Sequence, residues 1–158
     1  MQLRVLGCSG GIRQGRHTSS FMVDHDILLD AGSGVGELSL AEMESIRHIF
    51  LTHSHLDHSG FIPLLLDSIF DQIQQPVVIH GREATLQAFR EHIFNGVMWP
   101  DFSRIPSVER PVVRLERMEP GEERDIGHGR VVTMLPGTHA VPAAAYLVTA
   151  PGGGNIAY

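Results

Sequence analysis

Hydrophobic and polar positions along the 158-residue chain change spacing several times, which indicates short strands interleaved with helices. Residues 20–24 and 26–30 are apolar runs joined tightly at His25 and predict a β-hairpin. From 61 to 73 apolar residues recur every three or four positions, which predicts an amphipathic helix. Further strands are expected at 2–7, 48–52, 77–79, 112–115, 130–135, 145–149 and 155–158. This order predicts an α/β or α+β fold with mixed sheets.

Capping and stop signals locate the helices more closely. Ser39 precedes Glu42 by three positions, the capping-box spacing, so a short helix is expected over 40–45. The helix over 61–73 should stop before Pro76, and a second amphipathic helix is expected over 82–94. No repeat, low-complexity stretch or linker divides the chain, so residues 1–158 are expected to form a single domain.

Composition excludes several classes of chemistry. The chain has 12 basic residues, all arginine, so Schiff-base and P-loop lysine chemistry is excluded. A single cysteine excludes an internal disulfide framework and a cysteine-only metal site. The net charge of −6 disfavours a broad nucleic-acid platform. Because no signal peptide or membrane-spanning run is visible, a cytoplasmic location without a membrane partner is expected, and a homo-oligomer is compatible with the sequence.

Histidines are the unusual feature of the composition, with ten in the chain. Three of them and Asp57 fall within the six positions from His53 to His58, in a predicted strand-to-helix loop. A turning loop can direct His53 and His55 toward one metal ion, and Asp57 and His58 toward a second. Imidazole and carboxylate suit zinc, iron or manganese, and two ions roughly 3.5–4 Å apart can hold a bridging hydroxide. The alternative interpretation is a solvated polar loop.

The H-x-H-x-D-H spacing, together with Thr18-Ser-Ser-Phe-Met-Val and Ile27-Leu-Leu-Asp-Ala-Gly, resembles the metallo-β-lactamase-fold hydrolases. The resemblance implies an αββα sandwich with a dinuclear site, most simply of zinc, at one edge between two sheets. It implies that His53, His55 and a third histidine bind the first ion, and that Asp57 and His58 bind the second. Asp57 would also handle a proton. His139, which follows the strand predicted over 130–135, is the candidate third ligand.

Within that superfamily, Leu56, Pro63 and the run Val78-Ile-His-Gly-Arg-Glu look like the class II 3′,5′-cyclic-nucleotide phosphodiesterases. The resemblance implies hydrolysis of a small phosphodiester by a metal-bound hydroxide. The glycine-rich loop over 7–11 is also shared with ribonuclease Z, so an RNA endonuclease stays open, as do other hydrolases of the fold and a non-catalytic metal-binding fragment. Trp99 and Phe102 either pack hydrophobically, the favoured interpretation, or line a base-binding pocket.

The family pattern also includes a bridging aspartate and a last histidine. No aspartate follows Asp125 and no histidine follows His139. We therefore expect the chain to be the N-terminal part of a longer domain, with an incomplete second sheet. On that expectation, residues 1–158 alone are inactive or poorly folded.

Overall fold

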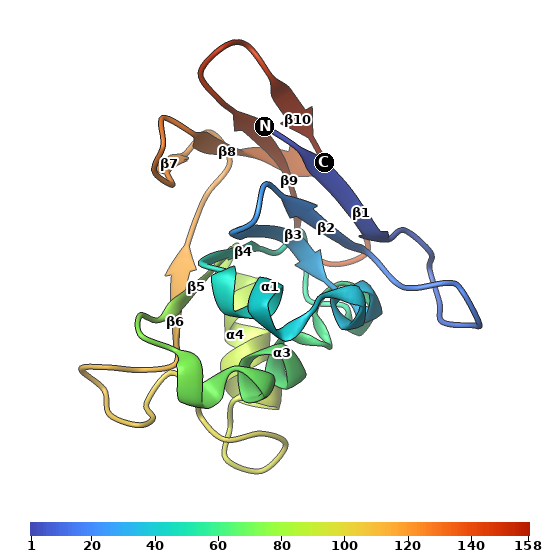
Figure 1. Ribbon diagram of the computed structural model, residues 1–158. Coiled ribbons are helices and arrows are strands. Elements are labelled where there is room, and N and C mark those ends of the chain that lie inside the picture. The colour runs from blue at the N-terminus through green and yellow to red at the C-terminus, as the bar shows by residue number, and fades with distance from the viewer.

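Six strands form the first sheet of the computed structural model, which describes residues 1–158 (Figure 1). They are, in spatial and chain order, β1 (Leu3–Gly7), β2 (Ser20–Val23), β3 (Ile27–Ala31), β4 (His48–Phe50), β5 (Val77–Gly81) and β6 (Val113–Arg117). The first three strands pair antiparallel, and β3 to β6 pair in parallel. The carboxyl ends of the parallel strands therefore meet at one edge, where loops carry the histidines.

Helices cross over between the parallel strands and cover one face of this sheet (Figure 1). They are α1 (Leu40–Ser45), α2 (Leu56–Ser59), α3 (Ile62–Ser68) and α4 (Glu83–Ala88), with a π-helical turn after α4 over Phe89–Ile93. A core of 20 buried residues lies between the sheet and the helices and includes Leu28, Ile49 and Leu66. None of the helices has the length and apolar character needed to cross a membrane.

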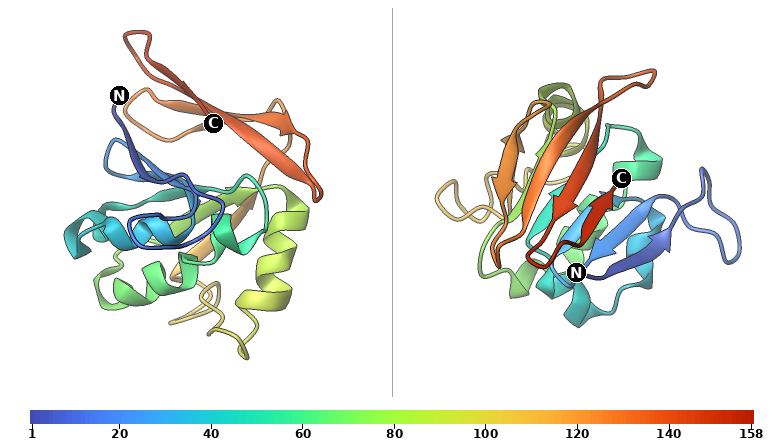
Figure 2. Two further views of the ribbon diagram at one scale, coloured as in Figure 1. Left: turned by 90° about the vertical axis from the view of Figure 1, so that its right-hand side faces the viewer. Right: turned by 90° about the horizontal axis from the view of Figure 1, so that it is seen from above.

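The second sheet has four antiparallel strands in the order β10-β9-β8-β7. Their bounds are β7 (Glu123–Asp125), β8 (Val131–Gly137), β9 (Ala143–Thr149) and β10 (Asn155–Ala157). It stacks on the free face of the first sheet, as the turned view in Figure 2 shows. A second core of 11 buried residues fills the space between the sheets. Within it, the rings of Phe50 and Tyr146 meet edge to face, with their centroids 5.3 Å apart. The layers are thus helix, sheet and sheet.

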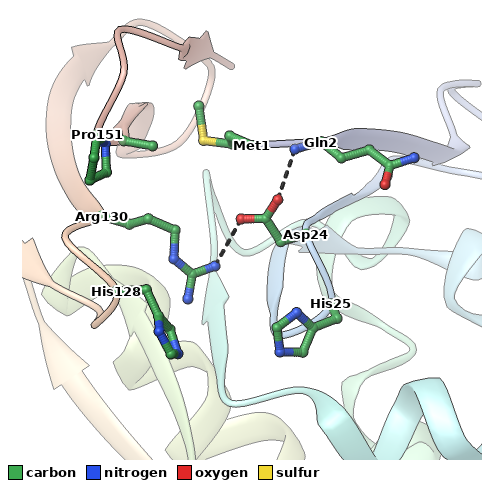
Figure 3. Close-up of a pocket in the computed structure, with 8 residues that line it drawn as sticks. Met1, Gln2, Asp24, His25, His128, Arg130 and Pro151 are labelled. Atoms are coloured by element: carbon green, nitrogen blue, oxygen red, sulfur yellow. Dashed lines mark hydrogen bonds and ion pairs between the residues drawn. The ribbon is translucent and has the colours of Figure 1, made fainter.

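A buried ion pair fastens the two sheets together at the end of β3 away from the histidines. The guanidinium of Arg130, at the start of β8, donates two hydrogen bonds of 2.7 Å to Asp26 and one of 3.1 Å to Asp24. Asp24 also accepts a hydrogen bond from the backbone N–H of Gln2. Figure 3 shows Gln2, Asp24 and Arg130 in the lining of a cavity, whose volume is about 550 Å³. The guanidinium of Arg130 is therefore paired with two carboxylates at this cavity.

Most predicted elements are present, with four differences. The helix predicted over 82–94 is α-helical only over Glu83–Ala88 and continues as a π-helical turn. The capping box is formed, and the helix it begins has the predicted bounds Leu40–Ser45. The helix predicted over 61–73 is shorter, because α3 ends at Ser68 and a 3₁₀ turn follows. Part of the predicted histidine loop is the helix α2. The strand β7 was not predicted, because its three residues are polar and partly exposed and pair only with β8.

Candidate metal centre

Two loops, one from each sheet, bring three of the predicted ligands together. His53 and His55 follow β4, and His55 is the N-terminal capping residue of α2. His139 lies between β8 and β9, and the backbone N–H of Ala144 at the start of β9 donates to the carbonyl of Thr52 at 2.8 Å. This bond ties the second-sheet loop to the strand end that carries the histidines. It explains how residues far apart in sequence become neighbours.

The three imidazoles have a geometry suited to one metal ion. Ligand atoms of His53, His55 and His139 all lie within 4.8 Å of one another, and His139 Nε2 is 3.4 Å from His55 Nδ1. His53 is buried while the other two are exposed, so the cluster opens to solvent on one side. Three convergent imidazoles with an open side are the donor set of a catalytic zinc site. The donors present therefore fit a divalent ion.

Asp57 and His58 lie beside this cluster on the helical turn α2. The ring of His58 is 4.3 Å from that of His53, and its Nε2 is 3.5 Å from Asp57 Oδ2. The Nδ1–H of His58 donates to Asp30 Oδ2 at 2.6 Å, which leaves Nε2 free on the side of Asp57. The pair thus offers one imidazole nitrogen and one carboxylate to a second position.

Asp30 is the functional residue that the sequence analysis missed. It is fully buried at the end of β3, with a left-handed backbone at φ 56°, which is uncommon for a non-glycine residue. Its carboxylate accepts hydrogen bonds from His58, from the backbone N–H and hydroxyl of Thr52 at 2.8 and 2.7 Å, and from the hydroxyl of Tyr158 at 2.8 Å. Its signal in the sequence is the Ile27-Leu-Leu-Asp-Ala-Gly run, which supported the family resemblance but was not assigned a role in the site.

The bonds around Asp30 also fix the orientation of His53. The single hydroxyl proton of Thr52 is donated to Asp30, so the same oxygen accepts from the Nδ1–H of His53 at 2.9 Å. His53 Nε2 is then the nitrogen with a free lone pair. A carboxylate that sets the tautomer of a metal-binding histidine is a recurrent arrangement in metal sites. Asp30 does so directly for His58 and through Thr52 for His53.

Burial and neighbouring charge separate the pKa values of these two histidines. Burial, followed by the like charge of His58, lowers the pKa of His53 to about 4, so the ring is neutral and able to bind a metal at pH 7. Burial also acts to lower the pKa of His58. The hydrogen bond from His58 to Asp30, together with the negative charges of Asp30 and Asp57, outweighs burial and leaves the pKa of His58 raised.

Close packing at Gly32 holds the α2 turn against β3. A Cβ at this position would lie 2.2 Å from the carbonyl oxygen of Asp57 and 2.3 Å from Thr18 Oγ1. Only glycine lets the three segments approach this closely. The position of Asp57 therefore depends on a contact that any side chain would break.

Comparison with known sequences identifies the family. A profile of the class-II cAMP phosphodiesterases matches residues 38–128, more than half of the chain. The chain belongs to the class-II cAMP phosphodiesterase family. This match confirms the family resemblance drawn from the H-x-H-x-D-H run. That Asp57, His139 and the other candidate ligands bind metal stays a prediction.

Two relatives are similar to this chain in sequence, and a solved structure shares its fold. A 3′,5′-cyclic-nucleotide phosphodiesterase of Candida albicans is 28% identical over 83 residues, covering 52% of this chain and 18% of the relative. A ribonuclease Z of Haloarcula marismortui is 32% identical over 127 residues, covering 75% of this chain and 41% of the relative. The metallo-β-lactamase fold protein YhfI from Bacillus subtilis superposes with a TM-score of 0.75 at 20% identity, over 99% of this chain and 60% of YhfI. The structure thus confirms the predicted fold class, and the chain spans less than half the length of the two relatives.

Proposed function

We propose that the protein carrying this chain is a metal-dependent hydrolase of small phosphodiesters, with 3′,5′-cyclic nucleotides as the first candidate substrates. The convergence of His53, His55 and His139 on one point carries this proposal. Membership of the class-II cAMP phosphodiesterase family supports the substrate class. The net charge of −6 favours a small diester over a long nucleic acid.

In this proposal the three histidines hold one divalent ion, and Asp57 and His58 contribute to a second, with zinc the best match to the donors. Divalent ions there would neutralise phosphoryl oxygens and lower the pKa of water. Asp57 is partly exposed beside His58 and is suited to accept a proton from the attacking water. Asp30 keeps His53 and His58 in the metal-binding tautomer.

The test is to measure bound zinc and the hydrolysis of cyclic AMP and of bis(p-nitrophenyl) phosphate. His53→Ala and His139→Ala should each lose both zinc and activity. His92→Ala, an exposed histidine away from the site, serves as the matched control and should retain both. Zinc binding that survives both site substitutions would overturn the assignment of the ligands.

A ribonuclease Z-like activity is the second candidate, and the similarity to the archaeal ribonuclease Z over 127 residues favours it. The two candidates differ in their response to salt. Binding to precursor tRNA through several phosphates should weaken steeply between 50 and 200 mM salt, by roughly 10³-fold or more for six or more contacts. Hydrolysis of a cyclic mononucleotide involves one phosphate and should change little. Cleavage of tRNA precursors without activity on cyclic AMP would favour the second candidate.

A further inference from the structure

The loop that carries His139 has few contacts of its own. It spans residues 138–142, between β8 and β9, and none of these five residues makes a backbone–backbone hydrogen bond. Four of the five, including His139, are exposed to solvent. The position of the third candidate metal ligand therefore depends on the residues where the loop joins the two strands.

One peptide group at the base of this loop is held on both sides. It joins Ala143 to Ala144 at the start of β9, and its C=O and N–H point in opposite directions. The N–H donates to the carbonyl of Thr52 at 2.8 Å, and the C=O accepts a hydrogen bond from Nη1 of Arg82 at 3.4 Å. In the left view of Figure 2, the turn between β8 and β9 lies beside the first turn of α4. The two bonds connect the loop to segments that follow β4 and β5 of the first sheet.

Arg82 has a fixed backbone and a side chain without a tight ion pair. It directly follows β5 and caps the N-terminus of α4, where its carbonyl accepts from the N–H groups of Thr85 and Leu86 at 3.0 and 3.1 Å. Its side chain is 33% exposed, and the neighbouring carboxylate of Glu119 is 4.0 Å away. Glu119 accepts a shorter bond of 2.9 Å from Arg117. The closest polar contact of the Arg82 guanidinium is therefore the one with β9.

We propose that Arg82 is a positioning residue of the metal centre, which acts on zinc through the backbone of the loop that carries His139; the inference rests on the proposed function. A group that hydrogen-bonds a metal ligand directly is worth about 10–100-fold in metal affinity. Arg82 acts one step further away, through a hydrogen bond that is longer than usual. We therefore expect a smaller effect, of about three- to tenfold.

The sign of the effect separates positioning from charge. A guanidinium stays positive in proteins, so its electrostatic effect on a nearby divalent ion is repulsive. Removal of this charge would by itself strengthen zinc binding or leave it unchanged. A loss of zinc affinity after a neutral substitution of Arg82 would therefore come from the lost hydrogen bond to Ala143 and not from the lost charge.

The test is to measure zinc affinity, by competition with a chromophoric chelator, in the protein carrying this chain. Arg82→Met and Arg82→Gln remove the guanidinium, so each should weaken zinc binding about three- to tenfold. Arg82→Lys keeps a donor and the charge and should keep most of the affinity. Arg90→Met is the matched control, because it removes the same charge from an arginine that pairs with Glu83 at 2.9 Å, and it should leave zinc affinity unchanged.

A second set of variants tests whether the effect passes through His139. In His139→Ala the loop has no ligand left to place, so Arg82→Met should not weaken zinc binding further in that background. Equal losses from Arg82→Met with and without His139 would overturn the proposal. Unchanged zinc affinity in Arg82→Met and Arg82→Gln, with either variant folded as judged by circular dichroism, would overturn it as well.

Measurements of turnover separate this proposal from the proposed function. A raised KM for cyclic AMP in Arg82→Met, with zinc affinity unchanged, would assign the guanidinium to the substrate phosphate and refute the positioning role. Zinc binding that Arg82→Met weakens only when His139 is present, in a protein with no diesterase activity, would support the positioning role and refute the proposed function.

Discussion

Acid should destabilise the fold through His80, an imidazole buried between the two sheets. His80 lies on β5, is 2% exposed, and stacks on Phe50 with ring centroids 4.3 Å apart. Burial, followed by the charges of His48 and Arg124, lowers its pKa to about 3. Its Nδ1 has no hydrogen-bond partner, and the nearest carboxylate oxygen, from the partly exposed Glu116, is 3.8 Å away. The other ring nitrogen, Nε2, lies 3.0 Å from Nδ1 of His48, so no carboxylate within hydrogen-bonding distance offsets the charge of a proton on the ring.

The loss of stability in acid follows from the difference between the pKa of His80 in the folded state and its pKa in the unfolded state. A histidine in the unfolded chain binds a proton near pH 6.5, whereas His80 in the folded chain binds one only near pH 3. Between these values the unfolded state holds more protons, so stability is complete above pH 6.5 and declines as the pH falls. Each pH unit below 6.5 costs up to about 1.4 kcal/mol, so about 2 kcal/mol should be lost by pH 5.

Urea unfolding at pH 7 and pH 5, with a chelator present to remove metal from the other histidines, measures this loss. Leucine has a similar volume and cannot titrate. Between pH 7 and pH 5, the free energy of unfolding of His80→Leu should therefore decrease less than that of the wild type, by a difference of about 2 kcal/mol. His92→Leu, at a side chain 74% exposed, is the control and should keep the wild-type dependence. Equal losses in the wild type and His80→Leu would refute the reasoning.

Three further substitutions test the metal centre and the contact between the sheets. Asp30→Asn removes the carboxylate that orients two histidines, so zinc affinity, measured by competition with a chromophoric chelator, should fall about 10–100-fold. Gly32→Ala would place a Cβ 2.2 Å from the Asp57 carbonyl oxygen, and urea titration should show a loss of about 1–3 kcal/mol in unfolding free energy. Arg130→Met leaves Asp26 buried and unpaired, so the same measurement should show a loss of about 3–5 kcal/mol; unchanged stability would contradict the role of this ion pair.

Local signals in the sequence were sufficient to predict most of the helices and strands. The capping box located α1 to the residue, because the Ser39 and Glu42 side chains satisfy the first backbone N–H groups whatever packs nearby. The extent of α3 and the existence of β7 depended on tertiary contacts. β7 has no apolar periodicity and exists because its backbone pairs with β8.

Some residues of the candidate site could be predicted from the sequence, and one could not. His53, His55 and His58 were visible because they lie within six positions of one another, and His139 was found through the family pattern. Asp30 was not assigned a role, although it stands in the Ile27-Leu-Leu-Asp-Ala-Gly run that supported the resemblance, because an aspartate near the end of an apolar strand is common. Its function depends on partners 22, 28 and 128 residues away in sequence. No local pattern contains that information.

Asp30 also connects metal binding to the packing of the two sheets. Its left-handed backbone and complete burial would be costly in isolation, on the order of 1–3 kcal/mol for the backbone alone, and hydrogen bonds from both sheets offset this cost. Thr52 and His58 donate from the segment that follows β4 in the first sheet, His58 from α2, and Tyr158 donates from the end of β10 in the second. Tyr158 is in turn held by two backbone hydrogen bonds to Tyr146 on β9. A displacement of the second sheet therefore removes a donor from Asp30 and moves His139 as well. Because linkage is reciprocal, an ion that binds His53 and His139 must in turn stabilise the docking of the two sheets.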